Sequence, residues 1–166
     1  FNLAAGSTLT AGIYNKTYDA TNNILNVLNC KFNISDFPNA IYFPHMGGAV
    51  EIETIINIHN TLFILQYGWA VNVQVSAKII TNNCFFYLRD SGAGIYVFLK
   101  SALSSIDITN CLFYLKNPTS SPNRYCVNLN NTAYITSNCN IIDCIFYAYE
   151  TSTYAINSSS GYDGIY

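Results

Sequence analysis

The residues that could carry acid–base or metal chemistry are few in this sequence and do not recur in a pattern. Its 166 residues hold nine carboxylates and two histidines. Enzymes that cleave polysaccharides use paired carboxylates, and here only Glu51 and Glu53 share one face of an extended segment, at positions i and i+2. Arg89 and Asp90 are interpreted as an ion pair in a loop. There is no Cys-x-x-Cys pair and no histidine ligand spacing, so the sequence predicts no catalytic residues, no metal site and no cofactor.

The six cysteines fall into two groups. Four of them stand two residues before a phenylalanine or its equivalent position and are candidates for small buried side chains: Cys30, Cys84, Cys111 and Cys144. The other two, Cys126 and Cys139, do not share this position and lie across one loop from each other. We predict them as a candidate disulfide, which would indicate an oxidising compartment.

Four Asn-x-Ser/Thr sequons are candidate sites of N-glycosylation: Asn15, Asn33, Asn130 and Asn157. Only 10% of the residues are charged, whereas ordinary soluble domains carry about 25%. Attached glycans would help such a surface to stay soluble. The sequons and the candidate disulfide together predict an extracellular or cell-surface location.

A short phrase recurs along the chain: an apolar strand, then Asn, a small residue, any residue and Phe. The bend residues are Asn29, Asn60, Asn83 and Asn110, with Asp143 in the last copy, and the phenylalanines are Phe32, Phe63, Phe86, Phe113 and Phe146. Consecutive phenylalanines lie 23 to 33 residues apart. Repeats of about 20–50 residues are typical of solenoids. Helical repeats are disfavoured, because Asn, Thr, Tyr and Ile are poor helix formers.

A second phrase, a small residue followed by Ile or Val, alternates with the first. It occurs at Gly12-Ile13, Ala40-Ile41, Ala70-Val71, Gly94-Ile95, Cys126-Val127 and Ala155-Ile156. Two recurring strand phrases and loops of variable length predict a right-handed parallel β-helix with three short strands per coil. The repeat spacing implies about five to six coils of roughly 23–33 residues each.

This fold assigns a place to each recurring side chain. Positions i and i+2 of a strand point to one side, so the cysteines and phenylalanines are expected to stack from coil to coil in the core. The asparagine before each cysteine is expected at a bend with positive φ, which Asn tolerates better than any residue except Gly. Stacked asparagine amides at these bends can also hydrogen-bond to one another along the coil axis.

The residue after each phenylalanine is expected to face outward. Tyr87, Tyr114 and Tyr147 occupy this position in consecutive coils, which predicts an exposed aromatic ladder with about 4.8 Å between rungs. Three interpretations stay open. The ladder packs laterally on a partner, it stacks on sugar rings, or it only reflects the preference of strands for aromatic residues.

These units resemble a known family. Gly47-Gly48-Ala49-Val50 and the Asn-Cys-x-Phe units are similar to the GGAI and FxxN repeats of chlamydial polymorphic outer-membrane proteins. More broadly, the chain resembles pectin-lyase-like parallel β-helices, which include adhesins, passenger domains and polysaccharide lyases. The resemblance covers nearly the whole chain, and it implies a fold rather than one activity.

Composition excludes several other classes of protein. The net charge of −2 and the scattered Lys and Arg residues argue against nucleic acid as a partner. No apolar run approaches the roughly 18 residues of a membrane-spanning helix. A hydrophobic content of 51% argues against intrinsic disorder.

We therefore expect one β-helix domain over residues 1–166. It is either an excerpt of a longer solenoid or a subunit of a stacked polymer, because no capping helix is recognisable at either end of the sequence. The leading hypothesis is a non-enzymatic extracellular structural protein, a β-helical unit of a surface filament or appendage that assembles by end-to-end stacking. The alternative is an adhesin or carbohydrate-binding β-helix with glycan partners. A polysaccharide lyase or hydrolase using Glu51 or Glu53 is the third and weakest hypothesis.

Overall fold

The computed structural model describes residues 2–3, 11–14, 23–35, 39–44, 54–89, 93–99, 104–116, 124–131, 138–148 and 153–158. Within these residues the regular structure is entirely β-strand, and the strands form three sheets, here named A, B and C. Glu51, Glu53, Asp90, Asn15 and the Gly47–Val50 motif lie outside the described residues.

The strands of each sheet are as follows. Sheet A contains β1 (Asn2–Leu3), β4 (Lys31–Ile34), β7 (Leu62–Leu65), β10 (Phe85–Leu88), β13 (Leu112–Leu115) and β16 (Ile145–Ala148). Sheet B contains β2 (Ala11–Tyr14), β5 (Asn39–Phe43), β8 (Trp69–Val73), β11 (Ala93–Leu99), β14 (Arg124–Asn131) and β17 (Thr153–Ser158). Sheet C contains β3 (Asn23–Leu28), β6 (Thr54–His59), β9 (Ala77–Asn82), β12 (Ser105–Thr109) and β15 (Asn138–Ile142).

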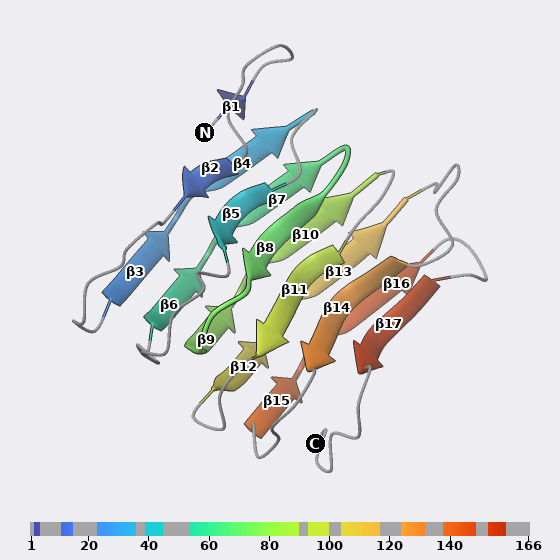
Figure 1. Cartoon of the computed structure of the whole chain (residues 1–166). Coiled ribbons are helices and arrows are strands. Elements are labelled where there is room, and N and C mark those ends of the chain that lie inside the picture. Colours follow the sequence, from blue (N-terminus) through green and yellow to red (C-terminus); the bar gives the residue numbers. More distant parts are fainter. Residues whose placement is uncertain are drawn as a thin grey trace.

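The chain visits sheets A, B and C in turn and then begins the next coil. Each strand pairs in parallel with the strand three elements later, so β4 pairs with β7 and β7 with β10. In Figure 1 the strands of sheets C and A run in the same general direction, and those of sheet B run back the other way. The predicted parallel β-helix is therefore confirmed as an all-β parallel solenoid.

The phenylalanines form the predicted stack along the interior of sheet A. Parallel pairing places Phe32, Phe63, Phe86, Phe113 and Phe146 in one register. Successive ring centroids lie 5.0, 4.9, 4.5 and 5.1 Å apart, and the ring planes are within 12° of parallel. The first four rings have no exposed surface. The stack therefore fills the interior behind sheet A with one aromatic side chain per coil.

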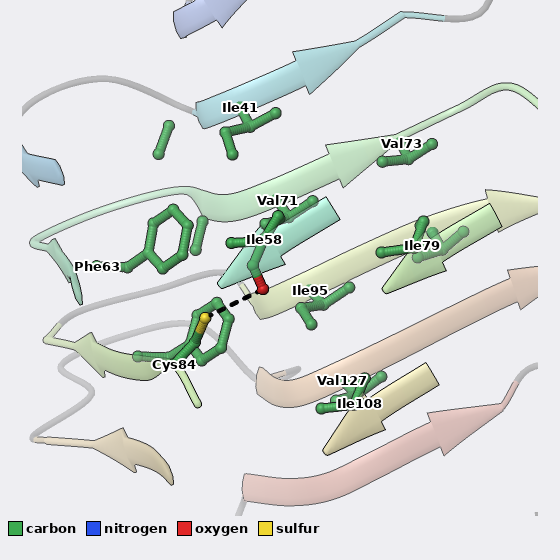
Figure 2. Close-up of a cluster of buried hydrophobic side chains, with 14 of the residues drawn as sticks. Ile41, Ile58, Phe63, Val71, Val73, Ile79, Cys84, Ile95, Ile108 and Val127 are labelled. Atoms are coloured by element: carbon green, nitrogen blue, oxygen red, sulfur yellow. Dashed lines mark hydrogen bonds between the residues drawn. The ribbon is translucent and has the colours of Figure 1, made fainter. Parts of the chain in front are cut away.

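The small residues of sheet B make room for these rings. A Cβ placed on Gly94 would lie 2.8 Å from the Phe113 ring and 2.7 Å from the carbonyl oxygen of Cys126. The β-branched residue that follows each small residue packs against sheet C. Val71, Ile95 and Val127 of sheet B belong to one buried cluster with Ile58, Ile79 and Ile108 of sheet C, and Figure 2 shows Val71 beside Ile58 and Val127 beside Ile108. The core is thus a layer of aliphatic side chains between sheets B and C, continued by the phenylalanine stack.

Candidate functional site

The bend between sheets C and A is made by the predicted asparagines in a left-handed conformation. The φ angles of Asn29, Asn60, Asn83 and Asn110 lie between 50° and 54°, and Asp143 in the last copy has φ 53°. Asn and Asp adopt this region more readily than other non-glycine residues because their short polar side chains can bond locally. The recurring bend therefore favours Asn or Asp over other residues that carry a Cβ at this position in each coil.

The amides of these bends also connect neighbouring coils, as expected. Asn60 Nδ2 donates to Asn29 Oδ1 at 3.1 Å, and Asn83 Nδ2 donates to Asn60 Oδ1 at 2.7 Å. In addition, the backbone N–H of each of the four bend asparagines donates to a carbonyl of the next coil, for example Asn83 to Thr109 at 3.1 Å. These five positions, Asn29, Asn60, Asn83, Asn110 and Asp143, are called the bend column. The bend column is thus a hydrogen-bonded edge that runs along the coil axis.

The residue after each bend asparagine has a role that the sequence did not reveal. Each thiol donates to the carbonyl oxygen two residues earlier, across the bend: Cys30 at 3.3 Å, Cys84 and Cys111 at 3.2 Å, and Cys144 at 3.3 Å. Thr61 makes the same bond through its hydroxyl, at 2.9 Å to His59. The interchange of Cys and Thr at this position follows from their shared ability to donate a hydrogen bond. These cysteines are more than small apolar side chains.

Tyr87, Tyr114 and Tyr147 form the predicted ladder on the outer face of sheet A. The ring centroids of Tyr87 and Tyr114 are 5.4 Å apart, and those of Tyr114 and Tyr147 are 4.9 Å apart, with the planes within 5° of parallel. Each ring face is therefore turned toward its neighbour along the coil axis. The ladder presents ring edges and hydroxyl groups to its surroundings, while most of its ring faces cover one another.

The rest of this outer surface is also apolar. The outward residues of β7, β10, β13 and β16 alternate with the buried ones, and we call them the aromatic face: Leu62, Ile64, Phe85, Tyr87, Leu112, Tyr114, Ile145 and Tyr147. Phe85 is 36% exposed, Tyr147 49% and Ile145 64%, and the others are half-buried. Contiguous apolar patches larger than a few hundred Å² mark contact sites in soluble proteins, and stacked copies would extend this face toward that size.

Polar residues border the aromatic face on two sides. Arg89 and Lys116 follow β10 and β13, and both are exposed. Their backbone N–H groups donate to Leu65 and Leu88 at 2.9 and 2.8 Å, so the two cations stand on adjacent rungs. The opposite margin is the bend column, which contributes neutral amides and, in the last copy, the exposed carboxylate of Asp143. The face therefore has one cationic margin and one amide and carboxylate margin.

The predicted disulfide between Cys126 and Cys139 is not formed. Cys126 lies on β14 in sheet B, Cys139 lies on β15 in sheet C, and both thiols are free and buried. Burial raises the pKa of Cys126 to about 12. Burial, together with the nearby Asp107 carboxylate, raises the pKa of Cys139 to about 11. Short separation along the chain misled the prediction, because the loop between the two residues joins different sheets.

The thiols of Cys84 and Cys111 meet inside the solenoid as stacked neighbours. The hydrogen bond with Cys84, reinforced by burial, raises the pKa of Cys111. Cys84 also lies 3.6 Å from the carbonyl oxygen of Ile58 in the preceding coil, the contact drawn in Figure 2. Both thiols are buried among the core side chains, so this pair is part of the packing rather than a reactive site.

The sequons within the described residues differ in their surroundings. Asn33 is exposed on the outer face of sheet A. Asn130 is half-buried, and its Nδ2 donates to the Tyr96 hydroxyl at 3.2 Å, so a glycan there would replace this bond. Asn157 lies in β17, paired with Asn128 of β14. Asn33 therefore has a side chain that is more accessible to a glycosyltransferase than that of Asn130.

Titratable groups in the described part of the chain do not gather into a site. No group of three or more His, Cys, Asp or Glu side chains there could hold a metal ion. Asp107, on the outer side of β12, accepts a hydrogen bond from Asn140 Nδ2 at 2.7 Å. The Glu51 and Glu53 pair and the Arg89–Asp90 pair include residues outside the described ranges, so the structure places neither pair.

Two further amide contacts between coils were not expected from the sequence. Asn57 Nδ2 donates to Asn26 Oδ1 at 2.9 Å on the outer side of sheet C. Asn72 Nδ2 donates to Asn39 Oδ1 at 2.8 Å, and both side chains are buried. The first pair shares a phase and could have been found by aligning the repeats, because Asn26 and Asn57 precede their bend asparagines by three residues. The second pair is offset in register.

Comparisons with known proteins return no relative. No protein-family model, no curated protein and no solved structure matches the chain. In the described residues, no helix is long and apolar enough to cross a membrane. The features of the molecule that bear on its function are therefore the ladders, the strand edges and the outer faces of the solenoid.

Proposed function

We propose that the chain is a non-enzymatic extracellular structural protein, a β-helical subunit or segment of a surface filament or appendage. In this proposal its coils continue onto the coils of a second copy by end-to-end stacking. The observation that supports it most directly is the repetition of identical side chains in register, since a coil built this way matches any further coil of the same kind. As part of this proposal, the coils are related to the repeats of polymorphic outer-membrane proteins and, more broadly, to pectin-lyase-like β-helices.

The last described coil offers groups for such a contact. Within the described residues, β15, β16 and β17 are the final strands of sheets C, A and B. The Ile145 N–H donates to Cys111 of the preceding coil at 2.9 Å. Because successive residues of a strand direct their backbone groups to opposite sides, Phe146 and Ala148 direct theirs away from β13. Open strand edges of this kind accept another strand.

The side chains of this last described coil, like its backbone groups, leave a surface on which a further coil could pack. Phe146 stacks on Phe113 through one ring face and is half-buried, whereas Phe32, Phe63, Phe86 and Phe113 are fully buried. Its second ring face is the place where the ring of a further coil would continue the stack. A second copy that supplies this ring would bury the residual apolar surface, which is the main driving force for association.

A proline substitution tests this proposal at one backbone group. Ala148→Pro removes an N–H that faces away from β13 and leaves the pairing of β13 with β16 intact. We expect wild type and the control Ala148→Ser to form filaments above a critical concentration. For Ala148→Pro this concentration should rise roughly tenfold, which corresponds to about 1.4 kcal/mol.

Sedimentation velocity and negative-stain microscopy over a concentration series provide the readout. Wild-type protein that stays monomeric at every concentration would contradict end-to-end assembly. Assembly of Ala148→Pro at the wild-type concentration would show that this edge is not the contact.

The alternative of an adhesin or carbohydrate-binding β-helix draws on the exposed ring of Tyr147. Sugars bind aromatic residues mainly through the ring face, and the faces of Tyr87 and Tyr114 are stacked on neighbouring rings. The geometry therefore favours packing over sugar recognition. Glycan-array binding that is lost on changing all three tyrosines to Ser would reverse this preference. Polysaccharide turnover abolished by Glu51→Gln or Glu53→Gln would instead support the enzyme hypothesis.

A further inference from the structure

We propose that the aromatic face is a lateral contact on which a second copy of this chain packs face to face, with the two coil axes parallel. This inference rests on the proposed end-to-end assembly, and it adds a second, sideways contact between stacked copies.

The shape and chemistry of the face suit the packing of one sheet on another. Its outward side chains form two columns along the coil axis, one containing Leu62, Phe85, Leu112 and Ile145 and the other Ile64 and the three tyrosines. Two such sheets pack about 10 Å apart with their side chains interdigitated. A flat, regular surface without charged residues in its middle fits a copy of itself.

The margins select the relative orientation of the two copies. A two-fold axis along the strands would bring Arg89 and Lys116 of one copy against the same cations of the other, which is unfavourable. A two-fold axis parallel to the coil axis instead places these cations opposite the bend column, with its amide oxygens and the Asp143 carboxylate. It also sets the Phe85 column of each copy against the tyrosine column of the other. Charge complementarity therefore selects the arrangement with parallel coil axes.

The area of the face explains why this contact depends on stacking. Four strands about 4.8 Å apart, with four residues of about 3.3 Å each, cover roughly 250 Å². A stable interface buries about 800 Å² on each partner. One copy is therefore too small to form a lasting lateral pair, whereas the faces of about three stacked copies together present enough surface, with the polar outward residues of β4, Lys31 and Asn33, between them. Lateral pairing should appear together with filaments and strengthen as they lengthen.

The test uses the full chain, a double lysine variant of the aromatic face and a single lysine variant of another face as the control. Phe85→Lys combined with Leu112→Lys places charges in the middle of the aromatic face, on outward positions. Ile80→Lys is the control, because Ile80 is a half-buried outward residue of β9 on sheet C. The readout is the mass per length of unstained filaments measured by scanning transmission electron microscopy. Lipid vesicles of neutral and anionic composition are tested for binding alongside.

We expect paired filaments for wild type and Ile80→Lys, and single filaments with half the mass per length for the Phe85/Leu112 variant. Pairing that survives in this variant, single wild-type filaments, or vesicle binding through the face in place of pairing would each overturn the inference. If wild type forms no filaments but forms side-by-side dimers that only the Phe85/Leu112 variant loses, the lateral contact stands and the end-to-end proposal fails. If wild type is monomeric at all concentrations, both fail.

Discussion

The difference between two adjacent phenylalanines tests the inside and outside assignment of every coil. Phe86 has no exposed surface, and its ring stacks on Phe63 at 4.9 Å and on Phe113 at 4.5 Å. Phe85, one residue earlier, lies on the outer face with 36% of its surface exposed. Truncation of each to alanine removes the same atoms from opposite sides of one strand.

The expected losses differ by several kilocalories per mole. Truncating a buried phenylalanine to alanine costs about 3–5 kcal/mol through lost transfer free energy and the cavity left behind. Phe86 has a ring stacked on each face, so Phe86→Ala should lie near the upper end, at about 5 kcal/mol. Phe85→Ala leaves no internal cavity and should cost about 1 kcal/mol. Since a domain has only about 5–15 kcal/mol of stability, the first variant should be barely folded and the second nearly normal.

Urea denaturation at 25 °C, followed by circular dichroism, provides the assay. With an m-value of about 2 kcal/mol/M, a difference of about 4 kcal/mol separates the two midpoints by about 2 M. The inclusion of urea also suppresses assembly, so the comparison reports on the folded coil. Equal midpoints for the two variants, or a lower midpoint for Phe85→Ala, would refute the assignment of Phe86 to the interior.

Three further predictions concern single groups in the structure. Asn83→Ala should lower stability by about 2 kcal/mol, because φ is 52° and the bond to Asn60 is lost, whereas Asn83→Gly should lower it by about half as much, which urea midpoints would show. Thr81→Val should raise the midpoint by about 0.5 M, because the buried Thr81 hydroxyl has no hydrogen-bond partner among the described residues; a lower midpoint would contradict this. The raised pKa values of Cys126 and Cys139, about 12 and about 11, predict full stability below about pH 8, since the thiols are then protonated in both the folded and the unfolded state. Above pH 9 mainly the unfolded thiols ionise, so the free energy of unfolding should fall by up to about 1.4 kcal/mol per pH unit for each thiol. In a series of urea midpoints from pH 7 to 11, the stability of the Cys126→Ala variant should fall less steeply than that of the wild type.

The repeat phase carried most of what could be predicted about the fold. Phe32 and its equivalents recur at one phase because each fills the same volume behind sheet A, and Asn29 and its equivalents recur because each bend has the same positive φ. Such positions are visible in a sequence since the physical demand is identical in every coil. The tyrosine ladder could be predicted for the same reason.

The sequence could not show the contacts between residues that occupy different positions in the repeat. The Cys126–Cys139 pair looked close along the chain, but the residues lie on different sheets, and only the course of the loop decides that. The Asn72–Asn39 bond joins residues at different phases. The donation of each thiol across its bend depends on a side-chain angle that no residue pattern encodes.

The stacking of like side chains from coil to coil is the claim on which all of these arguments depend, and ring-to-ring NOEs in solution NMR measure it most directly. With selectively labelled phenylalanine and tyrosine, the Phe86 ring should show NOEs to the rings of both Phe63 and Phe113, and the Tyr114 ring to those of Tyr87 and Tyr147. NOEs from the Phe86 ring to the Tyr114 ring, with none to Phe63 and Phe113, would contradict the solenoid and the functions proposed for it.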